Sequence, residues 1–161
     1  MRRLLQLTAV AFLAACGNAD AAPASEVELA AAIDQSLPTV VVYKTETCGC
    51  CNGWVEHMRA AGFQVDARNV RDIMSVKMEA GVPGAMVTCH TALVDGYVVE
   101  GHVPAEYIKQ MLADHPDIAG IGVPGMPVGS PGMEGPNPQP YQVLAFNHDG
   151  NVSVYADVDP R

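Results

Sequence analysis

The sequence predicts an α/β fold, and three observations lead to this prediction. Strand-like apolar runs alternate with segments of helical periodicity, in the order β-α-β-α-β-β-α. The length of 161 residues is that of one domain. A run rich in proline and glycine then separates these elements from two more strand-like segments near the C-terminus.

The first elements predict a strand, a helix and a second strand. Residues 39–43 form a β-branched run after Pro38, which is typical of a buried strand. Residues 50–61 have helical periodicity and stop before Gly62, and residues 63–70 alternate apolar with polar side chains. Such a unit predicts a crossover connection between two parallel strands.

The next elements predict a short helix and a β-hairpin. Asp72 is suited to cap a helix over residues 73–80. Residues 86–94 and 97–100 flank Asp95-Gly96, which is a strong signal for a hairpin turn.

A last helix and a C-terminal extension complete the predicted fold. Pro104 is suited to the first position of a helix that covers the hairpin. The resulting order, with cysteines where the first strand meets the first helix, is that of a thioredoxin-like domain, here over residues 38–115. Residues 116–161 are predicted to be an extension that begins as a long loop packed on the domain and ends in a second hairpin, formed by residues 141–147 and 152–157.

The N-terminus reads as an export signal. Arg2 and Arg3 precede a short apolar run that is too short to span a membrane. Residues 1–15 are therefore predicted to be a signal peptide, and the letters LAACG at 13–17 predict a lipoprotein signal with a lipid on Cys16. Ordinary cleavage a few residues later is the alternative. Residues 16–37, rich in alanine and small polar side chains, are predicted to be a tether.

The charge limits the partners. The formal net charge is −9 at pH 7, so no basic surface is available to neutralise the phosphates of a nucleic acid. We therefore expect a protein that binds no nucleic acid. We also expect a monomer that touches a membrane only through a lipid anchor at Cys16.

Three cysteines crowd the junction between the first strand and the first helix. Cys48, Cys50 and Cys51 fall within four positions, and a helix N-terminus favours the thiolate form. A thiolate is both the nucleophile of disulfide exchange and a soft metal ligand. Because a third thiol competes with a redox pair but adds to a metal site, the pattern favours Cu(I), bound as a polynuclear thiolate cluster.

Five other side chains can complete this metal site. Cys89 and His90 lie near the start of the predicted strand that faces the cysteine turn. Strand neighbours point to opposite faces, so both side chains reach the site only if the strand end twists. His102 lies between the hairpin and the last helix, and imidazole is a ligand for copper and zinc. Met126 and Met133 place soft thioethers in the Pro/Gly-rich run.

Other functions remain open at this point. The main alternative is a metal-free thiol–disulfide oxidoreductase that uses Cys48 and Cys51. A zinc site is disfavoured because the cysteines do not form two separated pairs. Two structural disulfides are disfavoured because Cys50 and Cys51 are adjacent.

Four sequence blocks together resemble the CopG-type copper-resistance proteins of Gram-negative bacteria. They are YKTETCGCC at 43–51, CHT at 89–91, EGHVP at 100–104 and GVPGMP at 122–127, within a match over about residues 39–158. The resemblance implies a periplasmic copper protein with a thioredoxin-like domain and an extension that helps to hold metal. It also implies interconversion of Cu(I) and Cu(II), and hence a copper oxidoreductase, with other periplasmic copper-handling proteins as partners.

Overall fold

A computed structural model describes residues 34–161. The predicted signal peptide, Cys16 and all but the last residues of the predicted tether lie outside the described residues. None of the helices in residues 34–161 combines the length and the apolar character needed to span a bilayer.

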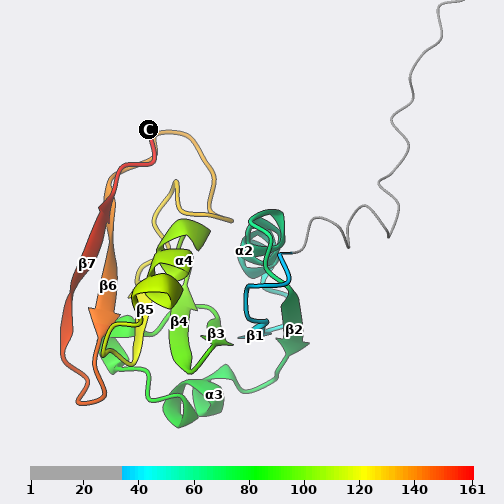
Figure 1. Ribbon diagram of the computed structural model, residues 1–161. Coiled ribbons are helices and arrows are strands. Elements are labelled where there is room, and N and C mark those ends of the chain that lie inside the picture. Colours follow the sequence, from blue (N-terminus) through cyan, green and yellow to red (C-terminus); the bar gives the residue numbers. More distant parts are fainter. Residues whose placement is uncertain (1–33) are drawn as a thin grey trace, which may run out of the picture.

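The fold is a mixed α/β arrangement built on one seven-stranded sheet, in the order β2-β1-β3-β4-β5-β6-β7 (Figure 1). The strands are β1 (Val40–Lys44), β2 (Val65–Asn69), β3 (Thr91–Val94), β4 (Tyr97–Gly101), β5 (Gly120–Val123), β6 (Tyr141–Phe146) and β7 (Val152–Val158). The helices are α2 (Gly49–Ala60), α3 (Ile73–Glu79) and α4 (Ala105–Asp114), with a 3-10 turn over Gly84–Met86. The predicted order of the first seven elements is confirmed.

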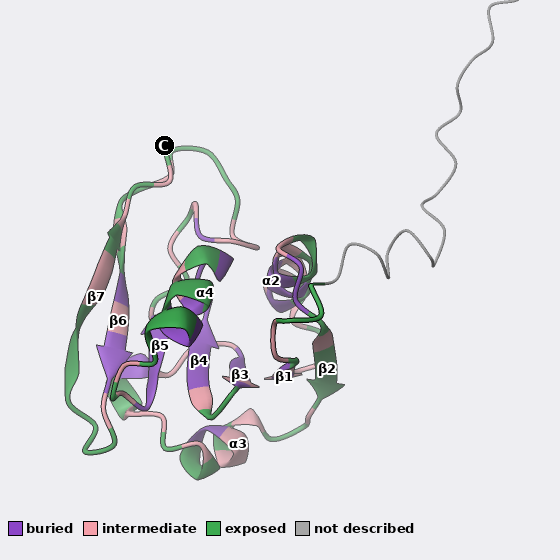
Figure 2. Ribbon diagram, viewed as in Figure 1, coloured by how far each residue is buried: buried purple, intermediate pink, exposed green. Residues whose placement is uncertain are grey.

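Two groups of apolar side chains lie on opposite faces of the sheet. Helices α2 and α4 cover one face with a core that includes Trp54, Met58 and Ile108. The smaller group, which includes Met86 and Phe146, lies on the face toward α3. The central strands are buried, whereas the edge strands β2 and β7 are largely exposed (Figure 2).

The strand register brings several chain segments together at one end of the central strands. Tyr43 of β1 pairs with Thr91 of β3, which pairs with Glu100 of β4, which pairs with Gly122 of β5. Because β3 runs opposite to β1 and β4, its start lies beside their ends. The segments just beyond this row therefore meet, although they are distant in the sequence.

Local signals set several element boundaries. Asp72 caps α3 by accepting hydrogen bonds from the backbone N–H groups of Met74 and Ser75, as predicted. Asp95 and Gly96 both have positive φ, as the predicted tight turn between β3 and β4 requires. Pro104 differs by one position, because it is the N-cap of α4 with ψ of 142° and not its first helical residue.

The predicted strand over residues 86–94 is wrong in its first half. Met86 ends a 3-10 turn, and β3 begins only at Thr91. Residues 87–90 have no strand pairing, so the alternation of a strand does not apply to Cys89 and His90. This removes the geometric objection to both side chains lying on the same side.

The Pro/Gly-rich run also contains a strand that the sequence prediction missed. Residues 120–123 form β5, which pairs in parallel with β4 and is buried throughout. A Cβ at Gly120 would lie 2.1 Å from the Val98 carbonyl oxygen, so glycine allows a close approach that side chains would prevent. The sheet is continuous from there to the antiparallel pair β6 and β7.

Candidate metal centre

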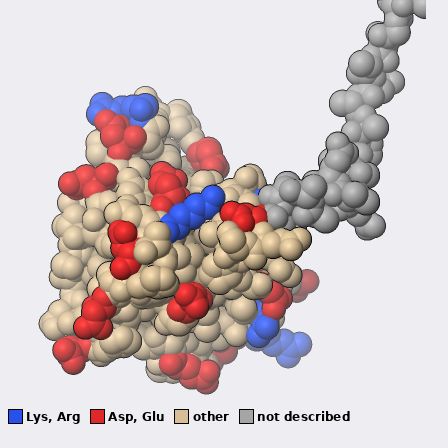
Figure 3. Space-filling view, in the orientation of Figure 1, with Lys and Arg blue, Asp and Glu red and all other residues tan. Residues whose placement is uncertain are grey.

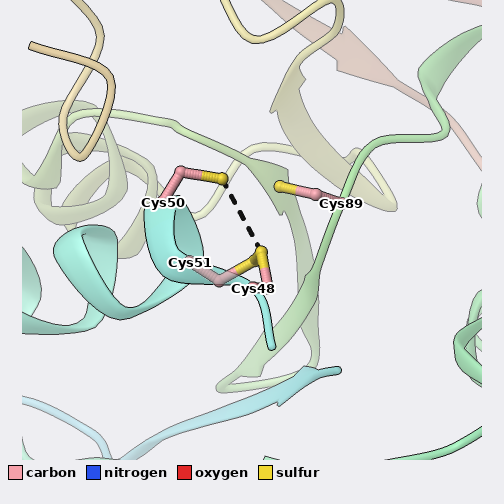
Figure 4. Close-up of side chains that lie close together, drawn as sticks. All are labelled: Cys48, Cys50, Cys51 and Cys89. Atoms are coloured by element: carbon pink, nitrogen blue, oxygen red, sulfur yellow. Dashed lines mark hydrogen bonds between the residues drawn. A yellow bond between two sulfur atoms is a disulfide. The ribbon is translucent and has the colours of Figure 1, made fainter. Parts of the chain in front are cut away.

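The cysteine turn lies where β1 leads into α2. Cys48 is the N-cap residue of α2, and Cys50 and Cys51 lie in its first turn. Cys48 and Cys51 form a disulfide, whereas Cys50 and Cys89 are free. The sulfur of Cys50 is 3.6 Å from that of Cys48, and Cys89 reaches toward them from the opposing segment (Figure 4).

The four sulfur atoms form one group that could hold a metal ion once the Cys48–Cys51 disulfide is reduced. The sulfurs of Cys48, Cys50, Cys51 and Cys89 all lie within 4.8 Å of one another. A second group, formed by Cys89, His90 and His102, meets the same limit and shares Cys89 with the first. The cluster therefore offers four sulfurs and two imidazoles, linked by a single cysteine.

Cys89 is the central residue of this arrangement. Its sulfur lies 3.2 Å from Nε2 of His102 and 3.4 Å from Nδ1 of His90. Burial, followed by the charge of Cys50, raises the pKa of Cys89 to about 12. Cys89 is thus a protonated thiol at neutral pH, and binding a metal through this sulfur would release its proton.

The tautomer of His102 follows from its backbone contact. Nδ1 lies 2.7 Å from the carbonyl oxygen of Pro131 and must donate, because a carbonyl can only accept. Nε2 therefore presents a lone pair toward the thiol of Cys89. Burial lowers the pKa of His102, which favours this neutral form. A carbonyl that orients an imidazole in this way is typical of metal-binding histidines.

His90 is the most enclosed side chain of the cluster. Its ring stacks against Trp54, with the centroids 4.6 Å apart, and meets the ring of His102 edge-on at 5.1 Å. Burial, followed by the charges of His102 and Lys77, lowers the pKa of His90 to about 3. Nε2 of His90 is buried without a hydrogen-bond partner. Nδ1 is the nitrogen that faces the sulfur of Cys89, so Nδ1 is the atom of His90 that is placed to join the cluster.

The segment after β5 packs directly on the cysteine turn. A Cβ at Gly53 would lie 2.9 Å from Cα of Gly132, and one at Gly132 would lie 2.5 Å from the carbonyl oxygen of Cys50. The two backbones touch because neither residue carries a side chain. Pro131, whose carbonyl oxygen lies 2.7 Å from Nδ1 of His102, directly precedes Gly132 in this segment.

The two methionines differ in position. Met133 is half-buried and directly follows Gly132, and its N–H donates to the carbonyl oxygen of Ser130. Met126 is 39% exposed, with a φ of +48°. The structure thus brings the backbone of Met133 close to the cysteine turn and leaves much of Met126 open to solvent.

His57 lies on α2 but has a different role. Its Nε2 accepts a hydrogen bond of 3.0 Å from the backbone N–H of Ala105, at the start of α4. Burial lowers the pKa of His57 and so favours the neutral form that this bond requires. His57 caps α4 and is absent from the cysteine and histidine clusters of the described residues.

Sequence reasoning missed the residues that support the cluster. The support consists of contacts between residues far apart in the chain: Trp54 with His90, the Pro131 carbonyl with His102, Gly53 with Gly132, and the buried ion pair of Lys77 and Glu100.

Acidic side chains are scattered over the face shown in Figure 3, and the basic side chains lie at separate points.

Comparisons with known proteins agree with this site. Residues 86–133 match a family described as "Protein of unknown function, DUF411", a span that holds Cys89, His90 and His102. No curated protein matches. Two solved structures, titled copper resistance protein CopG, form 2 and form 1, are each 43% identical to this chain. They cover 76% of this chain and 99% and 98% of their own, with TM-scores of 0.72 and 0.71.

The fold and the site together define a mixed α/β protein with a cysteine-rich cluster able to hold a metal ion. The identity and coverage show that the chain belongs to the CopG family of copper resistance proteins.

Proposed function

We propose that this protein binds Cu(I) in the periplasm and thereby contributes to copper resistance. The observation that carries the proposal is the convergence of four cysteine sulfurs within 4.8 Å, at the end of a sheet in a CopG-family chain. Thiolates are soft ligands and favour Cu(I), and adjacent cysteines are suited to bridging neighbouring ions. We infer a polynuclear thiolate cluster from Cys48, Cys50, Cys51 and Cys89, in which copper is the cargo.

The two imidazoles of the site are suited to copper in its second oxidation state, Cu(II). His90 and His102 share Cys89 with the sulfur group, and imidazole tolerates Cu(II) better than thiolate does. We infer that the ions are held in both states. The protein would act as a copper oxidoreductase if an external one-electron acceptor took the electron that Cu(I) loses on becoming Cu(II), or an external donor returned it. Met133 and Met126 are proposed as further thioether ligands, because each thioether is a soft donor that cannot form a disulfide.

The disulfide makes copper binding depend on the redox state. Cys48 and Cys51 cannot act as thiolate ligands while their sulfurs are bonded to each other. Two electrons and two protons from a dithiol reductant would break the bond and yield two thiols. The oxidised chain thus retains the Cys89–His90–His102 group, and the reduced chain gains the full sulfur group.

The experiment is anaerobic loading of the reduced protein with Cu(I), followed by measurement of bound copper and competition with a chelator. We expect more than one Cu(I) per chain and affinity sufficient to take copper from a weak chelator. Failure to compete with such a chelator would reject the proposal.

The alternative function is metal-free thiol–disulfide exchange, favoured by the Cys48–Cys51 disulfide. Two single variants separate the functions. Cys50→Ser removes a copper ligand but leaves the C-x-x-C pair, so it should impair copper binding and spare any reduction of insulin disulfides. Cys51→Ser should impair both. Insulin reduction by the copper-free wild type, unaffected by Cys50→Ser, together with weak copper binding would favour the alternative.

The remaining assignments are also proposals. We propose that residues 38–115 form a thioredoxin-like domain and that residues 116–161 form an extension that supports the site. Support comes from the β1-α2-β2 crossover and from Pro131, which contacts His102. We further propose export by a signal peptide over residues 1–15, anchoring of a monomer by a lipid on Cys16, and exchange of copper with other periplasmic proteins.

A further inference from the structure

A buried carboxylate lies directly behind the metal centre, on the face of the sheet toward α3. Glu100 of β4 forms an ion pair with Lys77 of α3, and their side chains are 0% and 1% exposed. The hydroxyl of Thr91 accepts a hydrogen bond of 2.9 Å from Lys77 and donates one of 2.8 Å to Oε2 of Glu100. Three polar side chains thus satisfy one another inside the protein.

The same carboxylate also holds the residue that precedes Cys89. Oε1 of Glu100 accepts a hydrogen bond of 2.7 Å from the backbone N–H of Thr88. The hydroxyl of Thr88 lies 3.1 Å from the same oxygen. Thr88 and Thr91 flank Cys89 and His90, which lie in the segment without strand pairing. Cys89 and His90 therefore lie between two threonines that are both hydrogen-bonded to the side chain of Glu100.

Glu100 also connects this segment to the third ligand residue. His102 follows Glu100 by two positions, and the N–H of Gly101 between them donates to the carbonyl oxygen of His90 at 3.2 Å. Gly101 has a φ of +73°, and a Cβ there would lie 2.8 Å from the hydroxyl of Thr88. The absence of this Cβ lets Thr88 pack against β4.

Stability does not by itself account for a buried charge pair at this place. Removing two charges from water is costly, and an apolar pair of similar volume is often equally stable or more stable. Lys77 is the only fully buried residue of α3, so the one side chain that this helix buries completely carries a charge. The pair supplies what an apolar pair cannot, namely an acceptor for the N–H of Thr88.

We propose that Glu100 is a positioning residue for the metal centre, with Lys77 as its counter-ion. Its carboxylate holds the Cys89–His90 segment at the distance from His102 at which all three ligand atoms converge. Neither residue binds the metal. The inference rests on the proposed function only for its copper readout, because the positions of the imidazoles can be measured without metal.

Two matched double variants isolate the acceptor from the charge. Lys77→Met with Glu100→Gln removes both charges but keeps an oxygen for the N–H of Thr88. Lys77→Met with Glu100→Leu removes both charges and the oxygen. The first should retain the ¹⁵N chemical shifts of His90 and His102 in the reduced, copper-free protein and bind Cu(I) almost as the wild type does. The second should shift those signals and weaken Cu(I) binding by about 10- to 100-fold, the usual effect of losing an outer-shell partner.

Other variants keep the test decisive. Neutralising the exposed Arg68–Asp66 pair as Asp66→Asn with Arg68→Gln should change neither readout. If the leucine double variant does not fold, Lys77→Met with Glu100→Met replaces it, because methionine also lacks a carboxylate or amide oxygen for the N–H of Thr88, and it should shift the imidazole signals. Equal behaviour of the glutamine pair and the leucine pair, or of the glutamine pair and the methionine pair if that replaces the leucine pair, would overturn the proposal. If the leucine double variant shifts the imidazole signals but the wild type binds no copper, the positioning role of Glu100 is supported and the proposed copper function is rejected.

Discussion

The sulfur of Cys89 lies 3.2 Å from Nε2 of His102, and this contact joins two segments that follow opposite directions in the sheet. Cys89 precedes β3 and His102 follows β4, so the β3–β4 register brings them together. The contact is itself held in place, because Pro131 fixes the tautomer of the imidazole.

The first prediction concerns His102. Replacement as His102→Gln should weaken Cu(I) or Cu(II) binding by at least about tenfold, because it removes the nitrogen that faces Cys89. The measurement is competition with a chelator of known affinity. His57→Gln is the control, since His57 caps α4 and lies outside the cluster. Equal losses in the two variants would indicate a general effect on the fold.

The second prediction concerns the disulfide. Oxidised protein should bind fewer Cu(I) ions per chain than protein reduced under anaerobic conditions, because Cys48 and Cys51 are bonded to each other in the oxidised state. Trp54 is the only tryptophan of the chain and stacks on His90, so its fluorescence should report on ion binding. The same Cu(I) stoichiometry in both redox states would exclude Cys48 and Cys51 as ligands.

The third prediction uses two glycines of α2. Gly53→Ala should lower the free energy of unfolding by about 1–3 kcal/mol, because the added methyl group meets the backbone of Gly132. Gly49→Ala is the matched control, since a Cβ there meets nothing within 4 Å. Chemical denaturation measures both changes. Equal stability of the two variants would show that the Gly53–Gly132 contact is loose in solution.

The fourth prediction concerns pH. The pKa of His90 is lowered from 6.5 to about 3 in the folded chain, so between these pH values the unfolded chain binds a proton that the folded chain does not. The free energy of unfolding should therefore fall as the pH drops from 6.5 toward 3, by up to about 1.4 kcal/mol per pH unit for this group. The stability contributed by the neutral His90 is fully present above pH 6.5.

His90→Phe tests this prediction. A phenyl ring can still stack on Trp54 but takes up no proton, so the copper-free variant should show a shallower decline in stability. Unfolding by urea at several pH values measures the slope for both proteins. Identical slopes would mean that His90 is not buried in its neutral form.

The sequence allowed most of the fold and the cysteine turn to be predicted. Asp72 and Asp95-Gly96 act within a few residues of their own position, so they can be read without a structure. The start of β3 and the whole of β5 were missed for the opposite reason. Both depend on which neighbouring strand offers a partner, and Gly120 and Gly122 do not look like strand residues in isolation.

The sequence by itself determined the order of the elements, the placement of three cysteines at a strand–helix turn and the residue types able to bind a soft metal. These follow from local periodicity and from the chemistry of single side chains. Only the tertiary structure decided that Cys89 and His102 touch, that Pro131 orients the imidazole and that Glu100 holds the segment before Cys89. Such contacts join residues far apart in the chain, and they form only when the sheet register and the buried packing bring those residues together.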